Sequence, residues 1–183
     1  MAGGTWTTDV LRFWFEETAP DQWFKKDDAF DQSVRAHFRQ THEHVASLSR
    51  EDCSTDPDTA LAAIIVLDQF SRNMFRGTTR AFASDPQALR IAETAIANGF
   101  DRQVSAGVRL FFYLPFEHAE AGEAQARSVA LITALADPEL VKWAEAHKAV
   151  IDRFGRFPHR NAILGRTSTL QELEFLQLPG SAF

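Results

Sequence analysis

The sequence contains a single cysteine, Cys53, among 183 residues. An internal disulfide is therefore excluded, and one cysteine is typical of a protein in a reducing cytosol. Cys53 lies in the polar stretch 51–54 without a neighbouring base, so we do not expect it to act as a nucleophile. The first residues also lack the basic and apolar pattern of a secretory signal, and we predict a cytoplasmic location.

Long apolar runs and an excess of basic residues are also missing. The uninterrupted apolar run 60–67 has only eight residues, too few to cross a bilayer, so we expect no membrane partner. The formal net charge is −6, whereas proteins that bind nucleic acid usually carry a basic footprint. We therefore expect no nucleic-acid partner.

Alternation typical of strands is absent, and helix signals are present instead. Three Asp-Pro pairs, at 56–57, 85–86 and 137–138, each place an N-cap acceptor before a proline suited to the first helical position. The helix predicted from Asp137 ends at Gly155. Its apolar stripe consists of Leu140, Trp143, Ala144, Val150, Ile151 and Phe154.

Further helices are predicted from the same periodicity. A stripe over 30–48 predicts a long amphipathic helix beginning near Asp27 or Asp28, and the run 60–67 predicts a central, fully buried helix. Thr8 or Asp9 is the predicted cap of a short first helix. The others cover 85–98, 103 to a proline break at Pro115, 122–135, and a last one opened by the capping box of Thr169 and Glu172.

Short turns between these helices are typical of helical-hairpin arrays. We therefore expect an all-α fold in one domain over residues 1–183, with 1–6 and 177–183 flexible.

The first candidate site is the polar end of the buried helix. Asp68 and Arg72 stand one turn apart on the face that Leu61 and Ile65 bury. The pair is either a structural ion pair or an acid that orients Arg72 toward a ligand anion. Structural networks imitate sites, which favours the first interpretation. Further candidates in this motif are Gln69, Asn73 and Arg76.

The second candidate is the stretch 153–166, which has four arginines, one histidine and no acid. An irregular cationic loop with aromatic residues is a reasonable anion-binding surface. Alternatively, its arginines cap helix ends and pair with acids elsewhere. The candidate residues are Arg156, His159, Arg160, Asn161 and Arg166.

The third candidate is the pair Glu117 and His118, next to Pro115, which offers an acid and a base. Neighbours on a helix point about 100° apart, so the two side chains need not touch. His147 lies on an apolar stripe, either as a satisfied core histidine or as a pocket residue. The sequence contains no zinc-ligand spacing and no phosphate-binding or dinucleotide-binding loop, so we expect no metal and no cofactor.

These stretches resemble the bacterial domain-of-unknown-function 924 family. The resemblance is carried by 67–73 with 75–78, by 114–118, and by 153–161 with 166–169, and it extends from about residue 10 to 176. It implies an all-helical fold of the tetratricopeptide-like superfamily, a right-handed α–α superhelix, and no established activity. The family usually has serine after the histidine of its middle motif. This chain has Ala119 there, so a reaction that needs that hydroxyl would be lost.

The three motifs are polar but have aromatic or apolar neighbours, so their polar groups must be paired or face a cleft. We predict that they line one cleft that binds an anionic small molecule or peptide. The alternatives are a metal-independent enzyme, in which Glu117, His118 and His159 do acid–base work, and a structural or assembly protein. The residues predicted to line the cleft are Asp68, Arg72, Arg76, His118, Arg156, His159 and Arg160.

Overall fold

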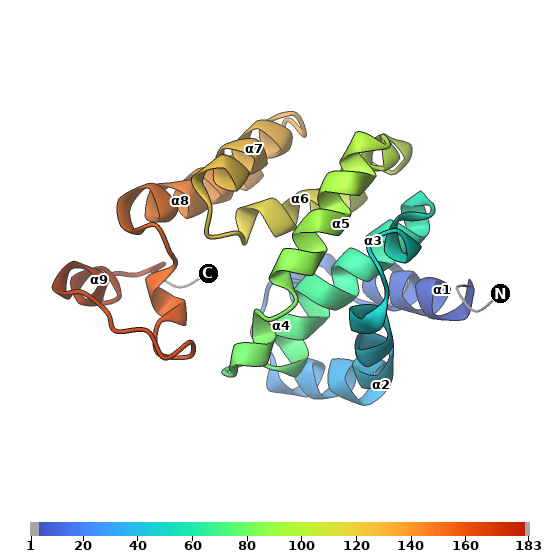
Figure 1. Ribbon diagram of the computed structural model, residues 1–183, viewed down its shortest axis with the longest axis horizontal. Helices are drawn as coiled ribbons and strands as arrows, with labels where there is room; N and C mark the ends of the chain where they lie inside the picture. The colour runs from blue at the N-terminus through green and yellow to red at the C-terminus, as the bar shows by residue number, and fades with distance from the viewer. Residues whose placement is uncertain (1–3, 182–183) are drawn as a thin grey trace. The chain divides into compact units, whose positions relative to one another are not determined.

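A computed structural model gives the fold of residues 4–181 (Figure 1). The regular segments in that range are all helical, which confirms the all-α prediction. Contacts group the chain into two compact units, Met1–Arg76 with Arg80–Pro115, and Gly77–Thr79 with Phe116–Phe183. Residues 1–3 and 182–183, which belong to the ends predicted to be flexible, lie outside the described range. That the chain is one domain stays a prediction, as does the right-handed superhelix.

Most of the connections between the α-helices contain a short 3₁₀ or π-helical turn. The first unit contains α1 (Gly4–Arg12), α2 (Asp28–Ser47), α3 (Pro57–Ile64), α4 (Ser71–Met74), α5 (Asp85–Ala97) and most of α6 (Ala106–Glu117). The second contains α7 (Gly122–Thr133), α8 (Pro138–Phe154) and α9 (Leu170–Phe175). Single π-helical turns at Phe13–Glu17 and Ile65–Phe70 extend α1 and α3.

The core of the first unit is built around α3 and its π-helical extension. The Asp56 carboxylate accepts a hydrogen bond from the Thr59 amide at 2.9 Å and begins the helix, as the Asp-Pro signal predicts. Every residue from 60 to 67 is buried, which confirms the prediction of a central helix. Both α1 and α5 pack against α3, and α2 packs against the π-helical turn that follows it (Figure 1).

Helix α2 also begins where the sequence predicts. The Asp27 side chain accepts from the amides of Ala29 and Phe30, and the helix runs from Asp28 to Ser47. The apolar stripe faces inward, because Val34, Phe38 and Val45 are buried.

Two helix starts were predicted wrongly. Helix α1 begins at Gly4, before the predicted caps, because Thr7 and Val10 are buried where α1 packs on α3, and this packing outweighs weak local propensity. Helix α5 begins at Asp85 itself, after Ser84, without a side-chain cap. The Asp85 carboxylate is instead bound by Arg72.

The proline in α6 does not end the helix where predicted. Residues 100–103 form a 3₁₀ turn after Gly99, and the α-helix begins at Ala106. It continues through Pro115 to Glu117, so the missing amide falls in the last turn, where it costs few hydrogen bonds.

In the second unit, α7 and α8 pack side by side (Figure 1). Asp137 caps α8 through the amides of Glu139 and Leu140, and Gly155 ends it with a φ of 70°, as predicted. The prediction that Trp143 is buried was wrong, because this side chain is 51% exposed. Trp143 is about 100° from its neighbour Ala144 around the helix, and Ala144 is on the buried side.

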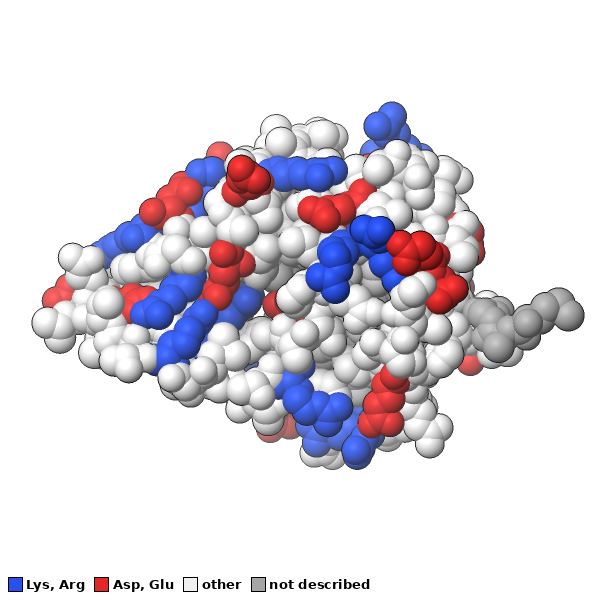
Figure 2. Space-filling view, in the orientation of Figure 1, with Lys and Arg blue, Asp and Glu red and all other residues white. Residues whose placement is uncertain are grey.

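The surface carries charges of both signs. Figure 2 shows Lys and Arg side chains interspersed with Asp and Glu over the face in view. Within residues 4–181, no helix combines the length and the apolar character that a membrane crossing requires.

Candidate functional site

The first polar motif forms an ion-pair network within the first unit. Asp68 is fully buried on the π-helical turn, and its Oδ1 lies 3.2 Å from Nη1 of Arg72. The same guanidinium donates to both oxygens of Asp85 at 2.9 and 3.0 Å. Burial alone would lower the pKa of Arg72, but the two carboxylates outweigh it and hold that pKa above its usual value. Arg72 therefore joins α4 to the start of α5.

A second network joins α4 to α2 through Asp31, which is only 7% exposed. Its carboxylate accepts from Nε and Nη2 of Arg76 at 2.5 and 2.9 Å and from Nδ2 of Asn73 at 2.8 Å. Gln69 donates to Asp68 at 2.6 Å. These contacts agree with the interpretation that the polar residues of this motif form ion pairs that hold the helices together. A role of these residues in ligand binding stays a prediction.

Asp31 and His42 were not predicted from the sequence. Both are buried, and both lie on the inward face of α2 with Val34 and Phe38. Their helical spacing from these two apolar residues could have indicated that they are buried. Nε2 of His42 lies 2.8 Å from Oγ of Ser71. Since Ser71 is fully buried, this pair is a hydrogen bond of the core rather than an accessible nucleophile and base.

In the second unit, Arg156 holds the loop before α9 in place. Its guanidinium donates to both oxygens of Glu172 at 2.7 and 2.8 Å and to the Thr167 carbonyl at 2.9 Å. Glu172 also completes the predicted capping box with Thr169. The hydrogen bond from Arg156 is the largest of the effects that lower the pKa of Glu172 to about 2.

Arg166 and Asn161 fix the same loop from within. Arg166 donates to the two oxygens of Glu120 at 2.6 and 2.9 Å and to Oδ1 of Asn161 at 2.9 Å. The Glu120 carboxylate also accepts from the Phe157 amide at 2.7 Å. Arg156 and Arg166 thus make the pairs with distant acids that the structural alternative predicts, and their role toward a ligand stays a prediction.

Basic side chains from two places in the second unit, α8 and the 3₁₀ turn Pro158–Arg160, gather around the ring of Phe157, which is fully buried. The ring of His147 lies edge-on to it with centroids 5.7 Å apart, the ring of His159 lies at 5.7 Å, and the guanidinium carbon of Arg160 lies 4.5 Å from its centre. The ring of His118 lies 6.3 Å from that of His147. We call Glu117, His118, His147, Phe157, His159 and Arg160 the Phe157 cluster.

Burial within the Phe157 cluster is graded. Glu117, His147 and Arg160 are each 6% exposed, whereas His118 and His159 are partly exposed. The structure therefore brings together candidates from the second and third motifs with His147. Phe157 was not predicted as a site residue, although its position between cationic residues in the sequence could have indicated it. That one cleft joins all three motifs stays a prediction.

Local backbone signals place these side chains. Gly155 ends α8 in the left-handed conformation, and Pro158 opens the 3₁₀ turn Pro158–Arg160, which carries two of the basic residues. At the other side of the cluster, Nε2 of Gln125 donates to the carbonyls of Glu117 and Ala119 at 2.6 and 2.8 Å. Gln125 is fully buried and fixes the end of α6, from which Glu117 projects.

His147 is held as a neutral imidazole. Its Nδ1 lies 2.8 Å from the Trp143 carbonyl, so Nδ1 carries the hydrogen, and 3.4 Å from Oε1 of Glu117. Burial, joined by the positive charges of His118, Arg160 and His159, lowers the pKa of His147 to about 3 against the opposing effect of that carbonyl. The contact with Glu117 is therefore made by a neutral ring and is not an ion pair at neutral pH.

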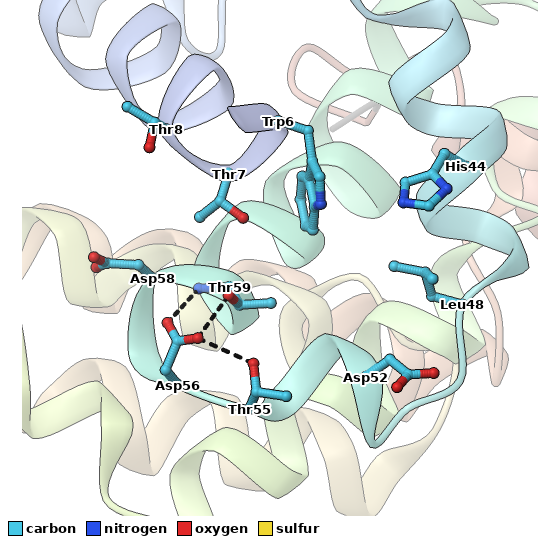
Figure 3. Close-up of a pocket in the computed structure, with 10 residues that line it drawn as sticks. All are labelled: Trp6, Thr7, Thr8, His44, Leu48, Asp52, Thr55, Asp56, Asp58 and Thr59. Carbon is cyan, nitrogen blue, oxygen red and sulfur yellow. Dashed lines mark hydrogen bonds between the residues drawn. The ribbon is translucent and has the colours of Figure 1, made fainter. Parts of the chain in front are cut away.

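A surface groove of about 550 Å³ lies elsewhere, in the first unit (Figure 3). Trp6 of α1 and His44 of α2 form one side, edge-on to each other with ring centroids 6.5 Å apart. Asp56 on the opposite side is occupied in capping α3 and in accepting from the Thr55 and Thr59 hydroxyls. None of the residues predicted for the site lines this groove.

Comparisons with known proteins agree with the fold. Residues 10–180 match the family described as bacterial protein of unknown function (DUF924). The solved structure of a protein of unknown function from Agrobacterium tumefaciens is 42% identical in sequence, with a TM-score of 0.89 over 93% of this chain and 96% of that chain. A comparison with curated proteins finds no match. The chain therefore belongs to the DUF924 family of bacterial proteins of unknown function.

Proposed function

We propose that the Phe157 cluster binds the anionic group, a carboxylate or a phosphate, of a small molecule or peptide. The observation that carries this proposal is that two imidazoles and a guanidinium surround one buried aromatic ring, with a third imidazole beside one of the two. The planar guanidinium suits bidentate binding of a carboxylate or phosphate, and its attraction for an anion is stronger in a desolvated place than in water. Arg160 is such a guanidinium, because it is 6% exposed.

Access from solution also supports this choice. His118 and His159 are only partly buried, which leaves part of the cluster within reach of a ligand from solution.

Calorimetric titration with sodium sulfate, inorganic phosphate and succinate tests the proposal. We expect at least one of these anions to bind, and its affinity to fall about tenfold or more in Arg160→Gln, which loses a charge-assisted pair. His159→Asn gives a second test in case Arg160→Gln fails to fold, and His44→Asn, which changes an exposed histidine of the first unit, is the matched control. An affinity that is the same in all variants, or no binding of any of the three anions, would overturn the proposal.

A metal-independent enzyme is the second candidate, and one observation favours it. The Phe157 cluster combines the carboxylate of Glu117 with histidines and a guanidinium, the groups that acid–base chemistry on an anionic substrate needs. Turnover of 4-nitrophenyl phosphate or 4-nitrophenyl acetate that is lost in both Glu117→Gln and His118→Asn would support it. Turnover that persists in both variants would exclude these roles.

We also propose a cytoplasmic location and a tetratricopeptide-like superhelix. The lone, buried cysteine supports the first, because a free thiol without a disulfide partner is typical of a reducing compartment. The side-by-side packing of α7 and α8 across a short turn supports the second.

A further inference from the structure

His147 lies at the centre of the Phe157 cluster, in contact with Glu117, His118 and Phe157. Glu117 and His118 face it from the end of α6. His159 and Arg160, from the 3₁₀ turn Pro158–Arg160, lie with it around the ring of Phe157. The Trp143 carbonyl faces it from its own helix. The charged residues of the neighbouring helix α7, Glu123 and Arg127, are exposed to solvent.

We propose that an anion bound in the Phe157 cluster brings a proton with it, and that His147 is the group that takes up this proton. The ligand is then bound as an acid, in the form of its anion and one hydrogen ion. The inference rests on the proposed function, because it needs an anion in the cluster.

The physical reason lies in the sum of charges around the ring. Without a ligand, burial and the basic neighbours His118, His159 and Arg160 oppose a positive charge on His147, and Glu117 is the acid in contact with it. An anion placed among these basic groups cancels part of their repulsion and pairs with the new charge. Protonation of the ring therefore becomes less unfavourable once the site is filled.

Thermodynamic linkage makes the effect reciprocal. If the anion favours the proton, the proton favours the anion by the same factor, so the affinity must rise as pH falls. Uptake of one proton changes the dissociation constant by at most about tenfold per pH unit. The affinity changes with pH only between the pKa of His147 in the filled site and its lower pKa in the empty site.

Sulfate is the suitable probe, since its own charge does not change between pH 8 and 5. We expect the dissociation constant of sulfate to stay nearly constant from pH 8 to 7, and to fall about three- to tenfold per unit between pH 6 and 5. Calorimetry at pH 5.5 in two buffers with different ionisation heats should show proton uptake. His147→Asn, which keeps an N–H donor for the Trp143 carbonyl, should flatten the pH profile, whereas His37→Asn should leave it unchanged.

The outcomes separate the inference from the proposed function. Binding with the same dissociation constant from pH 8 to 5, or a pH profile that His147→Asn leaves unchanged, overturns the inference alone. Absence of sulfate binding at every pH overturns the proposed function and the inference with it. If His147→Asn does not fold, nitrogen NMR of the wild-type imidazoles at pH 5.5 decides. The His147 signals should move toward those of the protonated ring when sulfate is added, and a ring that stays neutral contradicts the inference.

Discussion

Substitution of Glu120 by glutamine should loosen the loop that carries His159 and Arg160. The Glu120 carboxylate receives two hydrogen bonds from the Arg166 guanidinium, at 2.6 and 2.9 Å, and one from the Phe157 amide at 2.7 Å. Its side chain is 24% exposed, so these bonds are partly shielded from water. Glutamine keeps one acceptor oxygen, but it loses the charge and cannot accept from both guanidinium nitrogens.

The expected cost follows from these contacts. A hydrogen bond to a charged group contributes about 1.5–3 kcal/mol, and the contributions of neighbouring bonds do not add fully. With one acceptor retained and partial exposure, we expect the free energy of unfolding to fall by roughly 2–4 kcal/mol. For a chain of this size each kcal/mol corresponds to about 2–4 °C in Tm, so thermal unfolding should shift down by roughly 5–15 °C.

The dependence of this loss on pH gives the prediction its sharpest test. Burial alone would raise the pKa of Glu120, but the bonds from Arg166 and the Phe157 amide and the charges of Arg166 and Arg160 hold it below its ordinary value. A carboxyl with a lowered pKa stabilises the fold above its unfolded value, and this contribution disappears as pH falls. The difference between wild type and Glu120→Gln should therefore be largest near pH 7 and shrink below about pH 4.5.

Differential scanning calorimetry of both proteins between pH 7 and 3 measures this difference. Glu123→Gln, at an exposed site at the start of α7, is the control and should change Tm by less than about 2 °C. A shift for Glu120→Gln as small as that of the control, or a shift that does not change with pH, would refute the reasoning.

Three further predictions concern other parts of the chain. Asp31→Asn should lower the free energy of unfolding by about 2–4 kcal/mol in urea titrations, because the Arg76 guanidinium loses its carboxylate partner. The control Asp28→Asn, at an exposed position of the same helix, should have a far smaller effect. Gly155→Ala, at a φ of 70°, should lower the free energy of unfolding by about 1 kcal/mol in the same assay. Gly107→Ala, in α6 with no atom within 4 Å of the added carbon, should raise it by about 0.5–1 kcal/mol. Changes of the same sign in the two variants would contradict this reasoning. Burial favours the neutral form of His147, so the contribution of this ring to stability is present above about pH 6.5 and is lost as pH falls toward 3. His147→Asn should therefore lose less stability than wild type between pH 6.5 and 4. Equal losses in the two proteins would contradict this prediction.

The fold was predictable where a signal is local in sequence. Three carboxylates cap the helix that follows them, because each lies two or three residues before the backbone amide that donates to it. They belong to Asp27, Asp56 and Asp137. Gly155 ends α8 for an equally local reason, its tolerance of a positive φ. These signals do not depend on what the helix packs against.

Predictions failed where a distant partner decides. Asp85 carries a capping signal, but Arg72 lies 13 residues earlier and takes its carboxylate. Trp143 fits the apolar stripe of its helix, yet its side chain is 51% exposed. The same holds for the candidate site. The loop composition marked its arginines, but nothing near Arg166 in sequence indicates Glu120, 46 residues away.

Nitrogen NMR of the imidazole side chains during a sulfate titration tests the central claim most directly. The chain has six histidines, of which His118, His147 and His159 belong to the Phe157 cluster, while His37, His42 and His44 lie in α2 and serve as internal controls. If the Phe157 cluster binds an anion, the first three should shift along a saturable curve and the α2 histidines should not. Six histidines that shift alike with ionic strength, or none that shifts, would contradict the claim.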